Sequence, residues 1–259
     1  MKIVVCIKQV PGTTEVELDP VTNTIIRDGR QSVTNPFDSF AIEQAVQIKE
    51  SSGGEVIALS MGIPATRRLL LDAISRGADR GMLLSDRAFA GADTLATSYT
   101  LALGIKKLGG VDLILCGKMA VDGDTAQIGP ELAEQLGIAH VTDVFAFDQI
   151  SKNHLIVRRV LEDGYQTLKV PLPALICVVK DINMPRMPSI AGIRYSLTAD
   201  VTLCDAASLG ADSSKIGLSG SPTQVIKTYT PSRQGKAVSI KGTASAKAAA
   251  IANIVREVL

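Results

Sequence analysis

The sequence predicts an α/β protein with an open, mostly parallel sheet and helices on both faces. Short, continuously apolar runs are typical of strands buried in a parallel sheet, and they occupy residues 2–8, 55–61, 81–85, 112–117, 155–160 and 174–179. Amphipathic segments alternate with these runs and predict helices at residues 36–50, 64–76, 92–107, 125–136 and 244–258. This alternation is the pattern of an α/β fold.

Several predicted helices begin with a recognisable start signal. Pro36 follows Asn35, Pro64 opens the second helix, and Asp93 precedes Thr94. Proline is preferred in the first turn of a helix, and Asp or Asn is preferred as its N-cap. In the same way, Asp124 and Gln127 are three residues apart and predict a capping box at the start of helix 125–136.

Composition and charge exclude several classes of protein. The chain has 259 residues, 46% of them hydrophobic, and a net charge of +1, which gives no electrostatic argument for nucleic-acid binding. No apolar run approaches the ~20 residues of a membrane span. The first strand follows Met1-Lys2 directly and is too short for a signal peptide. We expect a soluble cytoplasmic protein that does not insert into a membrane.

The cysteines and histidines predict no metal site. Cys6, Cys116 and Cys177 lie in or at the ends of apolar runs, and Cys204 follows Val-Thr-Leu. No C-x-x-C pair occurs, and neither histidine has metal-ligand spacing to a cysteine. We therefore predict buried, reduced thiols and no hydrolytic triad.

The most informative loop lies between residues 112 and 137. An apolar run ends at Cys116-Gly117, a loop rich in Gly and Asp follows, and a helix then begins. Such a junction directs backbone N–H groups and the positive end of the helix dipole at one point, which suits a phosphate. Asp122 would repel a bare anion but could accept a hydrogen bond from a ribose or ribityl hydroxyl. A nucleotide is therefore favoured, with an ordinary βα turn as the alternative.

Three other loops, at residues 8–14, 61–64 and 85–94, follow the carboxyl ends of predicted strands, where ligands bind in open α/β sheets. They share the Gly, Ser, Thr and Asp content of the loop at 116–125. The chain has neither a G-x-G-x-x-G fingerprint nor a Walker A loop, so the usual NAD and ATP motifs are absent.

Several motifs together match one known family. They are Lys8 with Val10-Pro11, Asn35-Pro36-Phe37-Asp38, Ser60-Met61-Gly62 and the loop 121–130. The most specific stretch is 157–177. It contains, in order, a basic residue, an acidic pair followed by Gly, then Gln, an aliphatic residue and Pro. These are Arg159, Glu162, Asp163, Gly164, Gln166, Leu168 and Pro173. On these residues the chain resembles the β subunit of electron transfer flavoproteins over essentially its whole length.

The resemblance implies a Rossmann-like, adenine-nucleotide-hydrolase-like sheet domain at residues 1–195. Residues 196–259 would form an extended C-terminal arm and helix that dock on the α subunit of a heterodimer. The arm has no Asp or Glu between residues 213 and 256. Ile251, Ile254, Val255 and Val258 fall on one apolar helix face. The alternative is an arm packed on its own domain.

The loops 92–97 and 122–130 and the segment 217–225 resemble the electron-bifurcating members of the family. This implies FAD where ordinary members hold AMP, with NADH as the hydride donor. It also implies ferredoxin or flavodoxin as one electron acceptor and, through the α-subunit FAD, a flavin-containing dehydrogenase as the other. The chain would act only within its complex. One alternative is a non-bifurcating β subunit with structural AMP; a remote one is an ATP-linked nucleotide-binding module, which leaves the 157–177 signature unexplained.

The resemblance also implies the residues of the site, although no side chain is expected to be catalytic because the flavin carries the chemistry. The predicted cofactor contacts are Cys6, Lys8, Asn35, Asp38, Met61, Gly62, Asp93, Thr94, Thr97, Gly117, Asp122, Gly123, Asp124, Thr125, Ala126, Gln127 and Gly129. Weaker candidates for contact with NAD are Gly62, Phe89, Gly91 and Thr94. In the alternative reading, Thr94 and Asn35 only start helices, and Phe89 lies in the core.

Residues 180–197 contain prolines, methionines and aliphatic residues without helix or strand periodicity, which predicts a loop. The resemblance implies that this loop docks on the partner dehydrogenase. Ile190 is the candidate anchor, flanked by Arg186 and Arg194. The alternative is a loop folded back on its own core.

Overall fold

One large sheet organises the fold. The computed structural model describes residues 1–12, 32–226 and 239–258, and within them nine strands form this sheet. Their order is β11 (Val201–Cys204), β5 (Arg80–Leu84), β4 (Glu55–Met61), β1 (Lys2–Cys6), β6 (Leu113–Gly117), β10 (Ala174–Val178), β7 (Ala139–Ile150), β8 (His154–Leu161) and β9 (Gly164–Pro171). Neighbours from β11 to β7 pair in parallel, and only β7–β8 and β8–β9 are antiparallel. The predicted fold class is confirmed.

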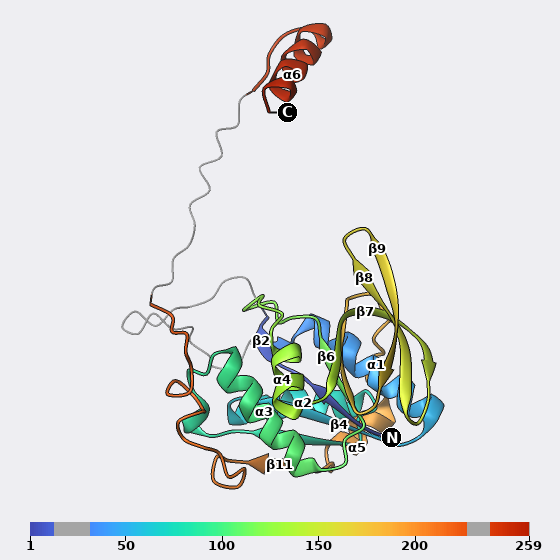
Figure 1. Cartoon of the computed structure of the whole chain (residues 1–259), viewed down its shortest axis with the longest axis vertical. Helices are drawn as coiled ribbons and strands as arrows, with labels where there is room; N and C mark the ends of the chain where they lie inside the picture. Colours follow the sequence, from blue (N-terminus) through green and yellow to red (C-terminus); the bar gives the residue numbers. More distant parts are fainter. Residues whose placement is uncertain (13–31, 227–238, 259) are drawn as a thin grey trace. The chain divides into compact units, whose positions relative to one another are not determined.

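Helices cover both faces of this sheet (Figure 1). Side chains of α1 (Pro36–Ser52) and α2 (Arg67–Ser75) share one buried cluster with alternate residues of the strands. Side chains of α3 (Thr94–Leu108) and α4 (Ile128–Leu136) share the other. The central strand β1 alternates accordingly, with Ile3 and Val5 in the first cluster and Val4 in the second, all with no exposed surface. Each such burial stabilises the fold by about 2 kcal/mol.

The antiparallel part of the sheet is larger than the sequence predicts. Only residues 155–160 were expected there, but β8 pairs with β7 on one side and β9 on the other, and β8 and β9 extend beyond the other strands (Figure 1). The burial pattern of β7 does not alternate because its register shifts twice and Asp143 has a φ of +59°. Two further strands, β2 (Gln9–Pro11) and β3 (Ser32–Thr34), form a small separate ladder.

Several predicted boundaries differ from those of the structure. The helix expected at 64–76 begins as a 3-10 turn, η1 (Pro64–Thr66), before α2, and a second such turn, η2 (Arg87–Phe89), follows β5. The segment 180–197 is not entirely a loop, because it contains α5 (Ile190–Ser196). Ser189 makes this short helix possible by accepting a hydrogen bond from the N–H of Gly192.

The chain divides into two compact units, Met1–Val225 and Ile226–Leu259. The second contains α6 (Ala244–Val258), on which Ile251, Ile254 and Val255 are about half exposed. Residues 227–238 of the predicted arm lie outside the described residues, and the predicted boundary at residue 195 stays a prediction. No helix in the described ranges is long and apolar enough to cross a membrane.

Candidate functional site

The candidate site begins at a row of thiols on the carboxyl edge of the sheet. Cys6, Cys116 and Cys177 are paired in register on β1, β6 and β10 and belong to the cluster under α3 and α4. All four cysteines are free and buried, as predicted. A hydrogen bond with Cys116, together with burial, holds the pKa of the Cys177 thiol well above its usual value. Burial likewise acts to raise the pKa of the Cys116 thiol. The side chains of Cys6, Cys116 and Cys177 together are called the thiol floor of the site.

Asn35 and Asp38, at the start of α1, tie the loops after β1 and β6 together. The Asn35 Nδ2 donates to Asp38 Oδ1 at 2.9 Å and to the carbonyl of Met119 at 2.8 Å. Asn35 Oδ1 accepts from the N–H of Val121 at 3.1 Å, and Asp38 Oδ2 accepts from the N–H of Lys8 at 2.7 Å. Asn35 is the N-cap residue of α1, but its side chain makes no cap hydrogen bond to the helix and holds the loops instead.

Asp38 is an unusual carboxyl group for this position. Burial raises its pKa from 3.8 to about 7, against hydrogen bonds from Asn35 and from the backbone N–H groups of Lys8 and Gly117 that lower it. Its surroundings admit no larger neighbour, because a Cβ on Gly117 would lie 2.5 Å from Asp38 Oδ1 and 2.7 Å from the carbonyl carbon of Phe37. Glycine at 117 is therefore required for α1 to approach β6.

The loop before α4 does not contain the predicted capping box. The helix begins at Ile128 rather than Thr125, and its N-cap Gln127 makes no side-chain cap. Asp124 instead turns back, donating its N–H to the carbonyl of Ala120 at 2.8 Å. Asp124 and Ala126 have φ values of +53° and +54°, a conformation that costs about 1 kcal/mol or more for a non-glycine residue. The N–H groups at the start of α4 are thus left without a side-chain cap.

Two contacts shape the surroundings of this helix start. The Nζ of Lys8 lies 2.7 Å from Asp122 Oδ1, so the charge that would repel a phosphate is balanced. Gly129 in the first turn lies against the thiol floor, where a Cβ would be 2.2 Å from Cys177 Sγ. The helix start therefore sits as close to the sheet as a glycine allows.

Asp93 organises the neighbouring loop. Its carboxylate caps α3 through the N–H of Ala96 at 3.1 Å, as predicted. It also accepts from the N–H and the hydroxyl of Thr223, at 3.1 and 2.8 Å, and its carbonyl accepts from the N–H of Thr97. Segment 221–223 is therefore part of the same loop cluster, which links two of the stretches that resemble the bifurcating members.

Glu131 is a member of the site that the sequence reading missed. The hydroxyl of Thr94 donates to Glu131 Oε1 at 3.0 Å and lies 3.3 Å from Gln127 Oε1. Burial raises the pKa of Glu131, and its Oε2 is buried without a partner among the described residues. Its place in the first turn of a helix that follows a Gly- and Asp-rich loop is the signal that could have identified it.

Other predicted contacts are placed as follows. Gly62, after Met61, donates its N–H to the carbonyl of Leu84 at 3.0 Å. Phe89 is buried in the core, at 5% exposed, and Gly91 has a φ of +75° and borders Leu218. Contact of any of these residues with a ligand stays a prediction, as it does for Gly123 and Thr125 in the exposed loop.

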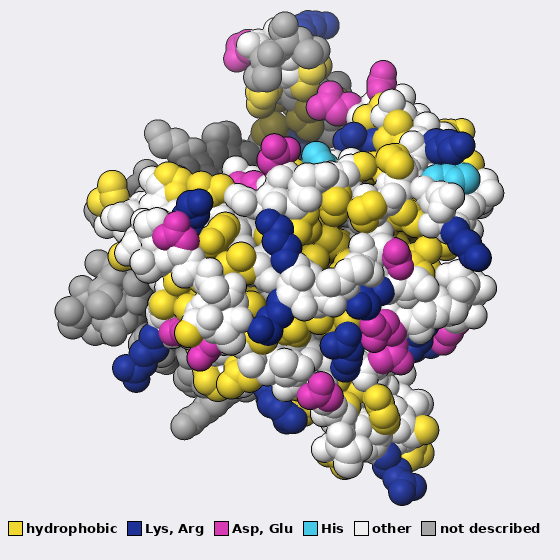
Figure 2. Space-filling view, turned by 60° about the horizontal axis from the view of Figure 1, so that its bottom comes forward, with side chains coloured by type: hydrophobic (Ala, Val, Ile, Leu, Met, Phe, Trp, Pro, Cys, Tyr) yellow, Lys and Arg dark blue, Asp and Glu magenta, His cyan; other side chains and the backbone are white. Residues whose placement is uncertain are grey.

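The three docking candidates are not part of this site. Ile190 is 83% exposed on α5, and Arg194 is also exposed. The guanidinium of Arg186, in contrast, is bound to Glu43 and Glu50 of α1. On the face shown in Figure 2, basic and acidic side chains are interspersed, so this face has no broad basic field.

Comparison with known proteins identifies the family. Residues 22–209 match the model of the electron transfer flavoprotein domain. The chain belongs to the electron transfer flavoprotein family. The electron transfer flavoprotein subunit beta of Clostridium acetobutylicum is 45% identical over 236 residues, which are 91% of this chain and 90% of that protein.

Two relatives of this electron transfer flavoprotein β subunit carry names of reductase complexes. The caffeyl-CoA reductase-Etf complex subunit CarD of Acetobacterium woodii is 46% identical over 244 residues, 94% of this chain and 93% of that protein. The acryloyl-CoA reductase electron transfer subunit gamma of Anaerotignum propionicum is 40% identical over 251 residues, with the same coverage of 94% and 93%. The chain is thus an electron-transfer subunit that pairs with an α subunit, works with dehydrogenases, and belongs to a family associated with flavin or AMP.

Proposed function

We propose that this chain is the β subunit of an electron-bifurcating electron transfer flavoprotein and that it holds FAD at the edge formed by β1, β6 and α4. When bound, FAD supplies the redox chemistry: hydride acceptance from NADH, then delivery of one electron to ferredoxin or flavodoxin and of the other, through the α-subunit FAD, to a flavin-containing dehydrogenase. The chain's own residues bind and orient the cofactor, and the chain acts only within the heterodimer.

The observation that carries this proposal is the uncapped start of α4 above the thiol floor. Its backbone N–H groups suit the pyrophosphate, and Gly129 allows the close approach to the sheet. The ion pair between Lys8 and Asp122 removes the repulsion that an unpaired carboxylate would exert on that anion. Asn35 and Asp38 hold the loops that would surround the adenosine half.

FAD rather than AMP is supported by the resemblance of loops 92–97 and 122–130 to bifurcating members. The names of the two reductase-complex relatives support a flavin-containing reductase of CoA esters as the partner. The exposed Ile190 is the residue that we propose inserts into this partner.

The test is the cofactor content of the chain purified with its α subunit. We expect two FAD and no AMP per heterodimer, with rapid bleaching of the flavin by NADH. One FAD plus one AMP, and no response to NADH, would make the chain the structural subunit of a simple electron carrier and would overturn the proposal.

A paired substitution tests the location of the cofactor. Gly129→Ala places a methyl against Cys177 Sγ, an overpacking that costs about 1–3 kcal/mol of stability. The start of α4 must move off the sheet to relieve it, and we expect this displacement to weaken FAD binding about tenfold, or about 1.4 kcal/mol. Adding Cys177→Ala removes the clashing sulfur and should restore most of that affinity. Unchanged FAD binding in Gly129→Ala would place the cofactor elsewhere.

A further inference from the structure

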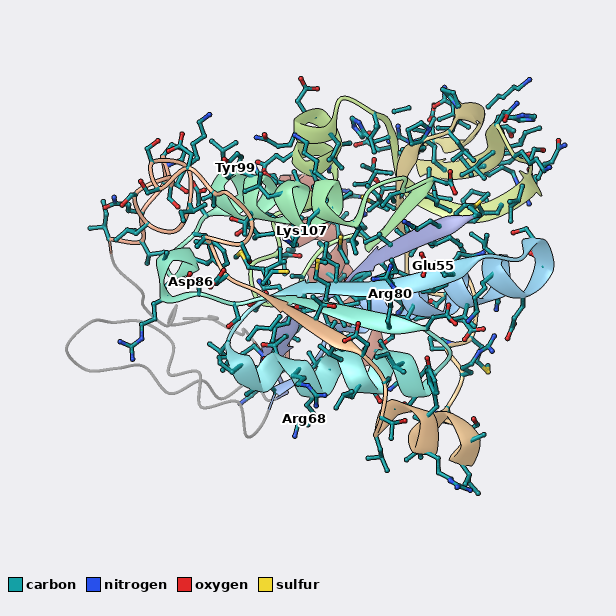
Figure 3. All side chains as sticks on the ribbon, turned by 90° about the horizontal axis from the view of Figure 1, so that it is seen from below. Glu55, Arg68, Arg80, Asp86, Tyr99 and Lys107 are labelled. Atoms are coloured by element: carbon teal, nitrogen blue, oxygen red, sulfur yellow. The ribbon has the colours of Figure 1, made fainter. Side chains whose placement is uncertain are left out.

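An apolar ridge projects from the segment that contains α5. It consists of side chains between 49% and 87% exposed, namely Met184, Met187, Ile190, Ile193 and Leu197. Figure 3 shows α5, in pale orange at the lower right, standing away from the sheet. Contiguous exposed apolar groups of this kind mark interaction sites. How the ridge keeps its shape therefore matters for what it can bind.

The ridge is not held by packing alone. A hollow of about 410 Å³ lies between it and the C-terminal ends of α1 and α2, lined among others by Lys49, Gly77, Met187 and Tyr195. α5 packs against α2, where a Cβ on Gly192 would collide with the carbonyl of Ser75, and the Tyr195 hydroxyl donates to the carbonyl of Asp79 at 2.9 Å. The base of the ridge needs an additional anchor.

Arg186 is that anchor. Its Nε and Nη2 donate to the two oxygens of Glu43 at 2.8 and 3.0 Å, and its Nη1 and Nη2 donate to the two oxygens of Glu50 at 2.5 and 2.9 Å. Its backbone N–H also donates to Glu43 at 3.1 Å. Glu43 and Glu50 are seven residues apart and so share one face of α1. The guanidinium is engaged by both carboxylates, the more buried of which has a side chain only 5% exposed.

A second polar contact lies three residues earlier. The Nδ2 of Asn183 donates to the carbonyl of Phe40 at 3.1 Å and lies 3.3 Å from Gln44 Oε1. Met184 and Met187, which flank Arg186, are 87% and 82% exposed. The side chains of Asn183 and Arg186 thus bind α1, while the neighbouring Met184 and Met187 are exposed to solvent.

We propose that Arg186 is a positioning residue: its bonds to Glu43 and Glu50 hold the apolar ridge in the conformation that the partner dehydrogenase binds, and its guanidinium does not contact the partner. This inference rests on the proposed function for the ridge as the docking surface. It replaces the expectation that Arg186 is itself a docking residue, because a bidentate guanidinium has few donors left for another protein.

The first experiment measures, without any partner, how firmly the bonds of Arg186 to Glu43 and Glu50 hold the ridge; we call these bonds the latch. Hydrogen–deuterium exchange of the whole heterodimer is compared between the wild type, Glu43→Gln and Arg186→Lys. Lysine cannot make the paired fork, so both variants should exchange amides 184–196 at least about threefold faster, while the amides of β1 and β6 are unchanged. Equal protection of 184–196 in all three proteins would overturn the inference.

The second experiment measures docking. Electron delivery from NADH-reduced heterodimer to a purified flavin-containing acyl-CoA dehydrogenase is followed while the dehydrogenase concentration is varied. We expect Ile190→Ala to raise the KM for the dehydrogenase by about tenfold, as for a central interface anchor. Glu43→Gln should raise it severalfold with kcat unchanged, although Glu43 lies behind the ridge.

The response of Glu43→Gln separates the two roles of Arg186. If Arg186 contacted the partner directly, weakening its bond to Glu43 would free the guanidinium and leave the KM equal or lower, which would overturn the inference. If Ile190→Ala has no effect on KM, the ridge is not the docking surface and the proposed function fails at that point. The exchange experiment would then still decide whether Arg186 is a latch.

Discussion

Asp38 and Glu43 lie five residues apart on α1, and both are almost fully buried, at 6% and 5% exposed. Their charges nevertheless differ. Burial raises the pKa of Asp38 to about 7. Hydrogen bonds from neutral groups and the charge of Lys8, which is not in contact with Asp38, lower this pKa but do not outweigh burial. Burial also acts to raise the pKa of Glu43, but hydrogen bonds from Arg186 and Gln47 outweigh it and lower the pKa overall.

The comparison shows that depth of burial and the partner together decide the state of a covered acid, because Asp38 lies deeper than Glu43 and has no cation in direct contact. The ammonium group of Lys8 pairs with Asp122, so Asp38 has no cation in contact. It accepts several hydrogen bonds and can carry a proton near neutral pH. Glu43 has the guanidinium of Arg186 in direct contact, so it remains charged and holds Arg186 in place. The first turn of α1 thus serves the proposed cofactor site, and the later turns serve the apolar ridge.

The largest expected effect comes from removing the cation that distinguishes the two acids. Arg186→Ala leaves Glu43 buried without its partner, which costs about 3 kcal/mol of stability. Urea unfolding of the heterodimer measures this loss. Arg194→Ala, which removes an exposed arginine of the same segment, should cost no more than about 0.5 kcal/mol. Equal losses of unfolding free energy in the two variants would contradict the role of Arg186 as the partner of Glu43.

The next effect depends on pH. Asp38 keeps its proton up to about pH 7 in the folded chain but loses it near pH 3.8 when unfolded, so its contribution to stability falls as pH rises through that window. The loss between pH 5 and pH 7 amounts to about 2 kcal/mol. Asp38→Asn, which does not titrate, should lack this slope in a series of urea unfolding curves. Parallel pH profiles for the two proteins would show that Asp38 is ionised throughout.

A smaller effect is expected from the tether beside Asp38. Asn35→Ala removes the bonds to the carbonyl of Met119 and the N–H of Val121. Without these bonds the loop after β6 must be ordered when FAD binds, and we expect this to cost about 1 kcal/mol, the value of one net hydrogen bond, so FAD affinity of the heterodimer should fall about fivefold. Fluorescence titration of the apoprotein measures it. Asn35→Asp keeps the acceptor for Val121 but sets a second carboxylate beside Asp38, and it should lose more above pH 7 than below.

The smallest effect concerns the exposed ion pair. Lys8→Gln removes the cation paired with Asp122, and because the lysine side chain is 42% exposed the expected change is only about 0.5 kcal/mol. FAD affinity should fall about twofold at low salt, and the difference should vanish at high salt. A loss that persists at high salt would mean that Lys8 binds the cofactor directly.

The strands of the sheet centre could be predicted because each is a short, fully apolar run, as in Ile3 to Cys6 and Leu113 to Cys116. The strands β7, β9 and β11 were missed because half-exposed or very short strands carry no continuous apolar signal, and bulges in β7 break its alternation. The start of α4 was misplaced because Asp124 and Gln127 satisfy a local rule that the backbone turn at Ala120 overrides.

The loops of the candidate site could be placed from strand ends, but not the contacts within them. Arg186 is separated from Glu43 by 143 residues, and no local pattern reports such a pair. One sequence signal was present: Glu43, with Gln44, interrupts the apolar residues Ala41, Ile42, Ala45 and Val46. An acid at such a position needs either a cation from elsewhere in the chain, as Glu43 has, or a raised pKa, as Asp38 has.

α1 carries Asp38, which binds the loops of the proposed cofactor site, at one end, and Glu43 and Glu50, which bind Arg186, towards the other. The helix therefore fixes the distance between these two attachments. From Asp38 to Glu50 the helix rises about 18 Å, at 1.5 Å per residue. One residue inserted between them would rotate the two ends by about 100° relative to each other, so that one of the two attachments must be lost. The length of this helix, as much as any side chain, sets how far the proposed cofactor loops stand from the ridge.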